Sequence, residues 1–188
     1  MSGTLKVGGV NLATHTGTDG TGNPVLDGGV VFPAGHIVKT TKYNLEEYAE
    51  AIGTAYTSGN KQYFEQIGSE SWDVTLAKAN SDILILGYFT MGNAANIIHF
   101  DMKVGGTGGT FIGAADGMST EHRPATEDKM NVGISFLHDP GTQAEGTTLT
   151  YVPYVGATGT MTLHINNYSL GYAHMEMVSH FIFLEVAT

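Results

Sequence analysis

Hydrophobic residues in this chain gather in short runs separated by glycine-rich joints. Residues 160–165 read Thr, Met, Thr, Leu, His, Ile, and this alternation indicates a strand with one buried face. Residues 82–91 are more continuously apolar, which indicates a strand covered on both faces. Residues 30–44 place β-branched and aromatic residues around a Pro-Ala-Gly turn. Further candidate strands are residues 71–77, 96–104, 131–137, 147–154 and 180–186, with glycine-rich joints at 105–109, 140–146 and 156–159.

About eight short strands with turn signals between them are typical of a sandwich, jelly roll or barrel. We therefore predict an all-β fold, a jelly-roll-like antiparallel β-sandwich over residues 30–188 that follows an extended N-terminal arm over residues 1–29. Trp72, the single tryptophan, lies in a candidate strand and is expected in the core. Two structures are predicted for residues 45–53. Asn44 could cap a short helix over these residues, or they could form a polar loop.

The arm holds one short apolar stretch, followed by Gly, Thr, Asp and Asn residues typical of turns. Alone it cannot bury enough apolar surface to offset the entropy lost on ordering. We expect a partner to order it, and the alternative is that it folds back on its own domain. The residues expected to make this attachment are Leu5, Val7, Val10 and Leu12.

Charge narrows the possible partners. Only 14% of residues are charged, the net charge is −10, and Arg123 is the single arginine. Binding to nucleic acid requires basic residues that neutralise phosphates, and anionic membranes attract basic segments, so neither partner is expected. The absence of cysteine excludes disulfides and thiolate metal sites. The first twelve residues lack the pattern of a signal peptide, so we expect synthesis in a host cytoplasm.

Candidate chemistry is sparse. The eight histidines form no H-x-H or HExxH motif, although His174 and His180 could meet their copies on a symmetry axis. His138 and Asp139 are the nearest candidates for hydrolysis, but no GxSxG motif accompanies them and an Asp-Pro-Gly turn is the better interpretation. Residues 104–113 lack the Lys-Ser/Thr ending of a phosphate-binding loop and predict a hairpin loop. We expect no catalytic residue, metal or cofactor.

Residues 171–180 concentrate side chains that are enriched at protein interfaces. They form either a subunit interface or a loop packed within one subunit. The residues of this possible interface are Tyr172, His174, Met175, Met177 and His180.

Four segments carry a family resemblance: VVFPAGHIVKTT (30–41), SDILILGYFT (81–90), LHDPGTQAEGTTLTYVPYV (137–155) and FIFLEVAT (181–188). In this order and spacing they resemble virion proteins from the tail-fibre and appendage genes of marine bacteriophages, as does the start MSGTLKVGGVNLAT. The sequence departs from that family at 44–70 and 105–130. The resemblance implies a trimeric β-sandwich displayed on a virion.

We therefore predict a non-enzymatic structural protein of a bacteriophage virion. The favoured role is a homotrimeric capsid decoration or cement protein that contacts the major capsid protein. The alternative is a tail fibre or short appendage that contacts other tail proteins and binds a host surface glycan. A glycan-binding module of a bacterial protein is a further alternative.

Overall fold

A computed structural model describes the backbone of residues 3–7, 10–15, 25–26, 34–45, 48–52, 55, 57, 59–92, 97–122, 130–165 and 179–188. Within these residues the chain is all-β, apart from the short 3-10 helix η1 (Lys61–Tyr63). No helix in this part of the chain is long and apolar enough to cross a membrane. The chain divides into two compact units, Met1–His36 and Ile37–Thr188.

The first unit contains a small antiparallel sheet with the order β1 (Gly3–Val7), β2 (Val10–His15) and β3 (Val25–Leu26). The predicted arm therefore has strand pairing of its own. The boundary predicted after Gly29 lies outside the described residues and stays a prediction.

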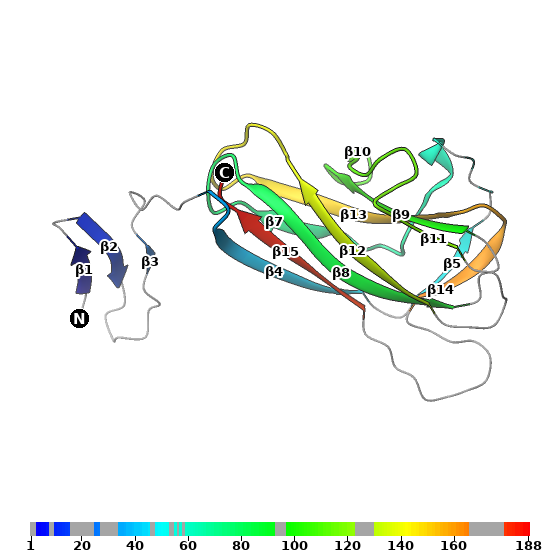
Figure 1. Ribbon diagram of the computed structural model, residues 1–188, viewed down its shortest axis with the longest axis horizontal. Helices are drawn as coiled ribbons and strands as arrows, with labels where there is room; N and C mark the ends of the chain where they lie inside the picture. The colour runs from blue at the N-terminus through cyan, green and yellow to red at the C-terminus, as the bar shows by residue number, and fades with distance from the viewer. Residues whose placement is uncertain are drawn as a thin grey trace, which may run out of the picture. The chain divides into compact units, whose positions relative to one another are not determined.

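The second unit is a sandwich of two antiparallel sheets, built around eight principal strands. One sheet has β4, β15, β8 and β12 side by side, and the other has β7, β13, β9 and β11 (Figure 1). Counted in chain order, the two sheets run 1-8-3-6 and 2-7-4-5, which is the strand order of a jelly roll. The bounds are β4 (Ile37–Leu45), β7 (Trp72–Thr75), β8 (Asp82–Gly92), β9 (Ile97–Val104), β11 (Ser119–His122), β12 (Met130–His138), β13 (Thr148–Ala157) and β15 (Ser179–Val186).

Four short strands extend these sheets. β5 (Tyr48–Ile52) and β14 (Met161–Ile165) join the sheet of β8, while β6 (Glu65–Gln66) and β10 (Thr110–Phe111) join the sheet of β13. The fold class predicted from the sequence is thus confirmed by the strand order.

The segment after Asn44 is neither of the predicted alternatives. β4 continues to Leu45, and residues 48–52 form β5, which pairs with β14. Ala49, Glu50 and Ala51 favour a helix, and pairing of β5 with β14 outweighs this local propensity.

The core lies between the two sheets and is rich in aromatic rings. Trp72 is 2% exposed, packs against Phe181 and Phe183, and donates its Nε1 hydrogen to Glu70, so its predicted core position is confirmed. Among the side chains of β8 that the structure describes, Ile83 and Ile85 are buried in this core, whereas Leu84 and Leu86 are half-buried and Tyr88 is exposed, so the expectation of a strand buried on both faces was wrong.

Candidate functional site

The outer face of the β4-β15-β8-β12 sheet carries a continuous set of apolar side chains. Along β15 residues alternate between the core and this face, and the register places Ile182 beside Leu86 and Leu184 beside Leu84. Leu137 on β12 pairs with Leu84 and is 56% exposed, so the set reaches the sheet edge. We define the outer apolar face as Ile37, Leu84, Leu86, Tyr88, Leu137, Ile182, Leu184 and Val186.

Charge is nearly absent from this face. In the paired parts of the four strands, the charged side chains on the outer side are Lys42 and Asp82, which are of opposite sign. The chain as a whole carries −10. The face is therefore a neutral surface on an acidic molecule, and contiguous apolar surface of this kind marks interaction sites.

The structure places only part of the predicted interface. His180 lies on the outer side of β15, and its ring meets the ring of Tyr88 edge to face at 4.5 Å between centroids. The other four residues, Tyr172, His174, Met175 and Met177, lie outside the described residues, so the interface stays a prediction.

The predicted attachment residues fall on strands of the first unit. Leu5 and Val7 lie on β1, Val10 and Leu12 lie on β2, and Val7 pairs with Val10. Their side chains lie outside the described residues, and their role in attachment stays a prediction.

A groove of about 450 Å³ opens at one end of the sandwich. The loop that joins β12 to β13 lies at the end of the sandwich that holds the C-terminus (Figure 1), and residues of this loop line the groove. Its lining combines apolar and polar side chains from β9, β12, β13 and that loop: Val104, Gly105, His138, Asp139, Pro140, Gln143, Thr148, Leu149 and Thr150.

His138 forms the inner wall of this groove. It is 9% exposed, and its Nδ1 lies 2.7 Å from the hydroxyl of Tyr151. Burial lowers the pKa of His138, while the carboxylates of Asp139 and Asp82 oppose that change. Burial also raises the pKa of Tyr151, so the phenol keeps its proton, and the tautomer of the neutral imidazole decides which of the two groups donates.

The His138–Asp139 pair does not form a catalytic dyad. Nδ1 of His138 faces Tyr151, while Oδ1 of Asp139 accepts the backbone N–H of Gly141 at 2.7 Å. The two hydroxyl groups in the lining, those of Thr148 and Thr150, bond to Thr75 and Asp73 rather than to His138. The turn interpretation fits, since Gly141 has a φ of +71° and Asp139 closes the loop onto it.

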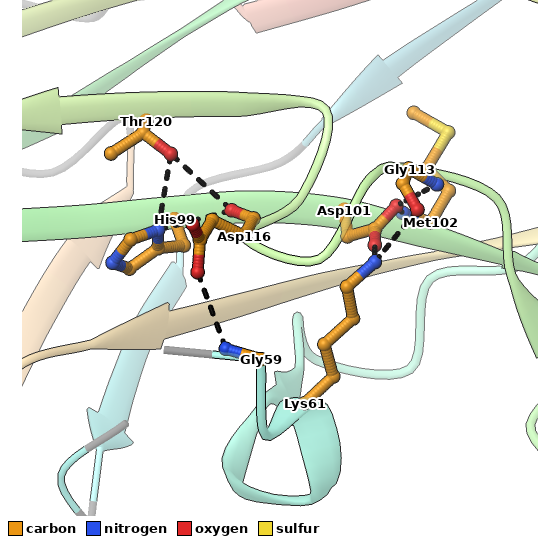
Figure 2. A network of polar contacts seen from close by, with 8 residues as sticks. All are labelled: Gly59, Lys61, His99, Asp101, Met102, Gly113, Asp116 and Thr120. Atoms are coloured by element: carbon orange, nitrogen blue, oxygen red, sulfur yellow. Dashed lines mark hydrogen bonds and ion pairs between the residues drawn. The ribbon is translucent and has the colours of Figure 1, made fainter. Parts of the chain in front are cut away.

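A buried polar network joins loop residues to strand β9, which belongs to the sheet of β7, β13, β9 and β11 (Figure 2). Asp101 on β9 is fully buried and forms an ion pair with Lys61 of η1, while its Oδ1 accepts the N–H groups of Met102 and Gly113. Lys61 also donates to the carbonyl of Gly113 at 2.9 Å. Burial raises the pKa of Asp101, and the hydrogen bond from Lys61 opposes that change. Sequence reasoning missed this pair because its members lie forty residues apart and belong to no motif.

His99 belongs to a second part of this network. Its Nδ1 lies 3.0 Å from the carbonyl of Asp116 and 3.1 Å from the hydroxyl of Thr120, and burial lowers its pKa. These contacts fix the loop before β11 rather than build a reactive centre. Among the described residues, no group of three or more His, Asp or Glu side chains is placed to hold a metal ion.

Comparisons with known proteins give distant similarities. No family model and no curated protein matches the chain. Among solved structures, capsids of infectious bursal disease virus are similar: the Gt strain at 13% identity and a TM-score of 0.46, and a VP2 subviral particle at 11% identity and a TM-score of 0.38. Each alignment covers 87% of this chain and 42% or 41% of the viral chain, so this chain spans about two-fifths of their length. The fold assignment rests on the strand order derived above: the chain is a jelly-roll sandwich.

Proposed function

We propose that this protein is a non-enzymatic structural component of a bacteriophage virion, displayed on the particle surface as a homotrimeric capsid decoration or cement protein. The outer apolar face is the observation that carries this proposal. Jelly rolls recur in viral capsid proteins, and such a protein requires a surface that packs against identical neighbours.

The occupant of the outer apolar face is a second copy of this chain. Two molecules of charge −10 repel one another, so copies associate best through a surface without negative charge. This face carries one positive and one negative side chain in its paired strands, Lys42 and Asp82. His180, one of the residues of the possible subunit interface predicted from the sequence, lies on the same side of this sheet.

The size of the face indicates how far the interface extends. The whole outer side of the sheet, with four strands about 4.8 Å apart and seven residues at about 3.4 Å each, has an area of roughly 450 Å² per copy. The outer apolar face lies mainly on its two central strands, β15 and β8, and has one residue each on β4 and β12. In a homotrimer this side packs against a different surface of the next copy, so each interface buries roughly 900 Å², below the approximately 1,200 Å² of a standard stable interface. The remaining area is expected from residues 171–178, which lead directly into β15.

Attachment to the particle is assigned to the first unit, with Leu5, Val7, Val10 and Leu12 contacting the major capsid protein or a tail protein. Deletion of residues 1–29 should abolish particle binding and leave the sandwich folded. A truncated protein that still binds particles would place attachment on the sandwich instead.

The experiment that tests the proposed role is localisation with copy number, by reconstruction and quantitative mass spectrometry of purified virions. Hundreds of copies on the shell support the decoration role. A few copies confined to the tail support the alternative, a tail fibre or short appendage that binds a host glycan. Absence from particles would overturn both.

A further inference from the structure

We propose that the groove beside the β12–β13 loop binds the terminal sugar of a neutral glycan. Its volume of about 450 Å³ lies within the range of about 300–1,000 Å³ typical of small-molecule sites. Such a site would serve the glycan contact of the tail-appendage alternative, but we infer it from the groove alone.

The charge of the groove excludes most other ligand classes. Asp139 is the one charged side chain in the lining, and no lysine or arginine faces a ligand there. Phosphates, nucleotides and acidic sugars require cationic partners and would be repelled by Asp139 and by the acidic chain. Half of the lining is polar, which disfavours a purely apolar ligand such as an acyl chain.

The polar side chains supply both donors and acceptors, as a polyhydroxylated ligand requires. Nδ1 of the neutral His138 imidazole is paired with the hydroxyl of Tyr151, and Nε2 is its second hydrogen-bonding nitrogen. The side-chain amide of Gln143, which gives one hydrogen to Pro140, has a second donor hydrogen and an acceptor oxygen. Asp139 uses one oxygen to accept from Gly141, and an ionised carboxylate has lone pairs for further hydroxyl donors. Thr150 donates to Asp73 at 2.7 Å, so its oxygen serves as an acceptor.

Apolar contacts complete the match. Val104, Pro140 and Leu149 line the same groove. A sugar ring presents hydroxyls at its edge and C–H groups on its face, and a site that alternates polar and apolar side chains contacts both. The lining holds no Phe, Tyr or Trp, so affinity for one sugar should be weak, with a dissociation constant on the order of 1 mM.

The loop is held in place before any ligand binds. Gln143 and Asn80 bond twice, the N–H of Asn80 to the carbonyl of Gln143 at 3.0 Å and the N–H of Gln143 to Oδ1 of Asn80 at 3.1 Å. The side chain of Gln143 donates to the carbonyl of Pro140 at 3.1 Å. Thr188 donates its hydroxyl to the carbonyl of Asn80, so the C-terminal residue secures the same turn. Binding to such a preformed site costs little ordering entropy.

The test is saturation-transfer NMR on the full chain with glucose, galactose, mannose and N-acetylglucosamine. Sialic acid and glucuronic acid are included as acidic sugars. We expect saturable binding of at least one neutral sugar and none of the acidic ones. Asp139→Asn should weaken that binding about tenfold or more, because it removes a charged acceptor and retains the bond to Gly141.

Glu145→Gln is the matched control. Glu145 lies exposed in the same loop but does not line the groove, so this variant removes the same charge and should bind as the wild type does. The proposal is wrong if no neutral sugar binds, if acidic sugars bind equally well, or if both variants behave alike. None of these results changes the location or copy number of the protein on a particle. The glycan site can therefore be wrong while the proposed virion role is right, and the reverse.

Discussion

The carboxylate of Glu185 accepts the backbone N–H of Ala77 with both of its oxygens, at 2.8 and 3.0 Å. The same carboxylate accepts the N–H of Lys78 at 2.8 Å, and Glu185 is only 1% exposed. A side chain of the last strand therefore satisfies the turn between β7 and β8, which lies more than one hundred residues earlier.

Glu185→Gln should lower the free energy of unfolding by about 1–3 kcal/mol, because the amide NH₂ would face backbone N–H groups that need an acceptor. Urea denaturation measures this change. Glu145→Gln, on an exposed loop, should leave stability within roughly 0.5 kcal/mol of the wild type. Equal stability of both variants would show that the buried carboxylate is dispensable.

Gly87→Ala should be destabilising by about 1–3 kcal/mol, because a Cβ there would lie 2.5 Å from Cδ1 of Phe181. Gly133→Ala on the adjacent strand β12 is the control, since a Cβ there meets nothing within 4 Å. That control should be neutral or slightly stabilising, because alanine is favoured over glycine within strands. Thermal unfolding of both variants compares the two positions directly.

Stability should fall as the pH drops below about 6.5, the ordinary pKa of histidine. Burial lowers the pKa of His138 and His99, so the unfolded chain binds protons at a pH at which the folded chain does not. His138→Gln, which can still accept from Tyr151, should reduce this dependence. The measurement is urea unfolding at about pH 7.5 and about pH 5.5, and an unchanged slope in the variant would contradict the prediction.

Protonation of Asp101 should raise the stability of the fold as the pH falls further, which is the opposite of the effect of the histidines. Burial raises its pKa above 3.8, so the folded chain takes up this proton at a higher pH than the unfolded chain. Between the pKa of Asp101 in the unfolded chain and its higher pKa in the folded chain, a fall in pH favours the folded state. The loss of stability caused by the histidines should therefore be smaller in that pH range. Asp101→Asn should remove that difference in the same unfolding series.

Leu137→Lys should disrupt self-association and leave the subunit folded. Leu137 is 56% exposed on the outer apolar face, so a lysine there costs the single subunit little but places a charge in the proposed interface. Gln62→Lys adds the same charge at an exposed position outside that face and should not change the assembly. Light scattering after size-exclusion chromatography gives the mass of each, and equal masses for the two variants would place the interface elsewhere.

The sequence predicted the strands well because their alternation reflects burial on one face. Residues 71–77, 82–91 and 131–137 are found as β7, β8 and β12 within a few residues. The short strands β6, β10 and β11 were missed, since two to four residues carry no measurable period. β5 was missed because its strand state depends on β14, more than one hundred residues away.

The candidate surfaces were less predictable. His138 and Asp139 were noted as neighbours in the sequence, but only the fold places Thr148, Thr150 and Val104 around the same groove. The apolar residues of β8 suggested a doubly buried strand, because a sequence does not distinguish a side covered by its own chain from one that awaits a neighbour.

The place of β15 in its sheet governs how this protein is made. β15 is synthesised after the other strands of the sandwich, yet it lies between β4 and β8 and supplies Phe181 and Phe183 to the core. While the ribosome still holds residues 179–188, β4 and β8 have exposed backbone edges and an unfilled interior. The sandwich can therefore close only after residues 179–188 have left the ribosome, and until then a chaperone, or a neighbouring nascent chain, can occupy the gap between β4 and β8.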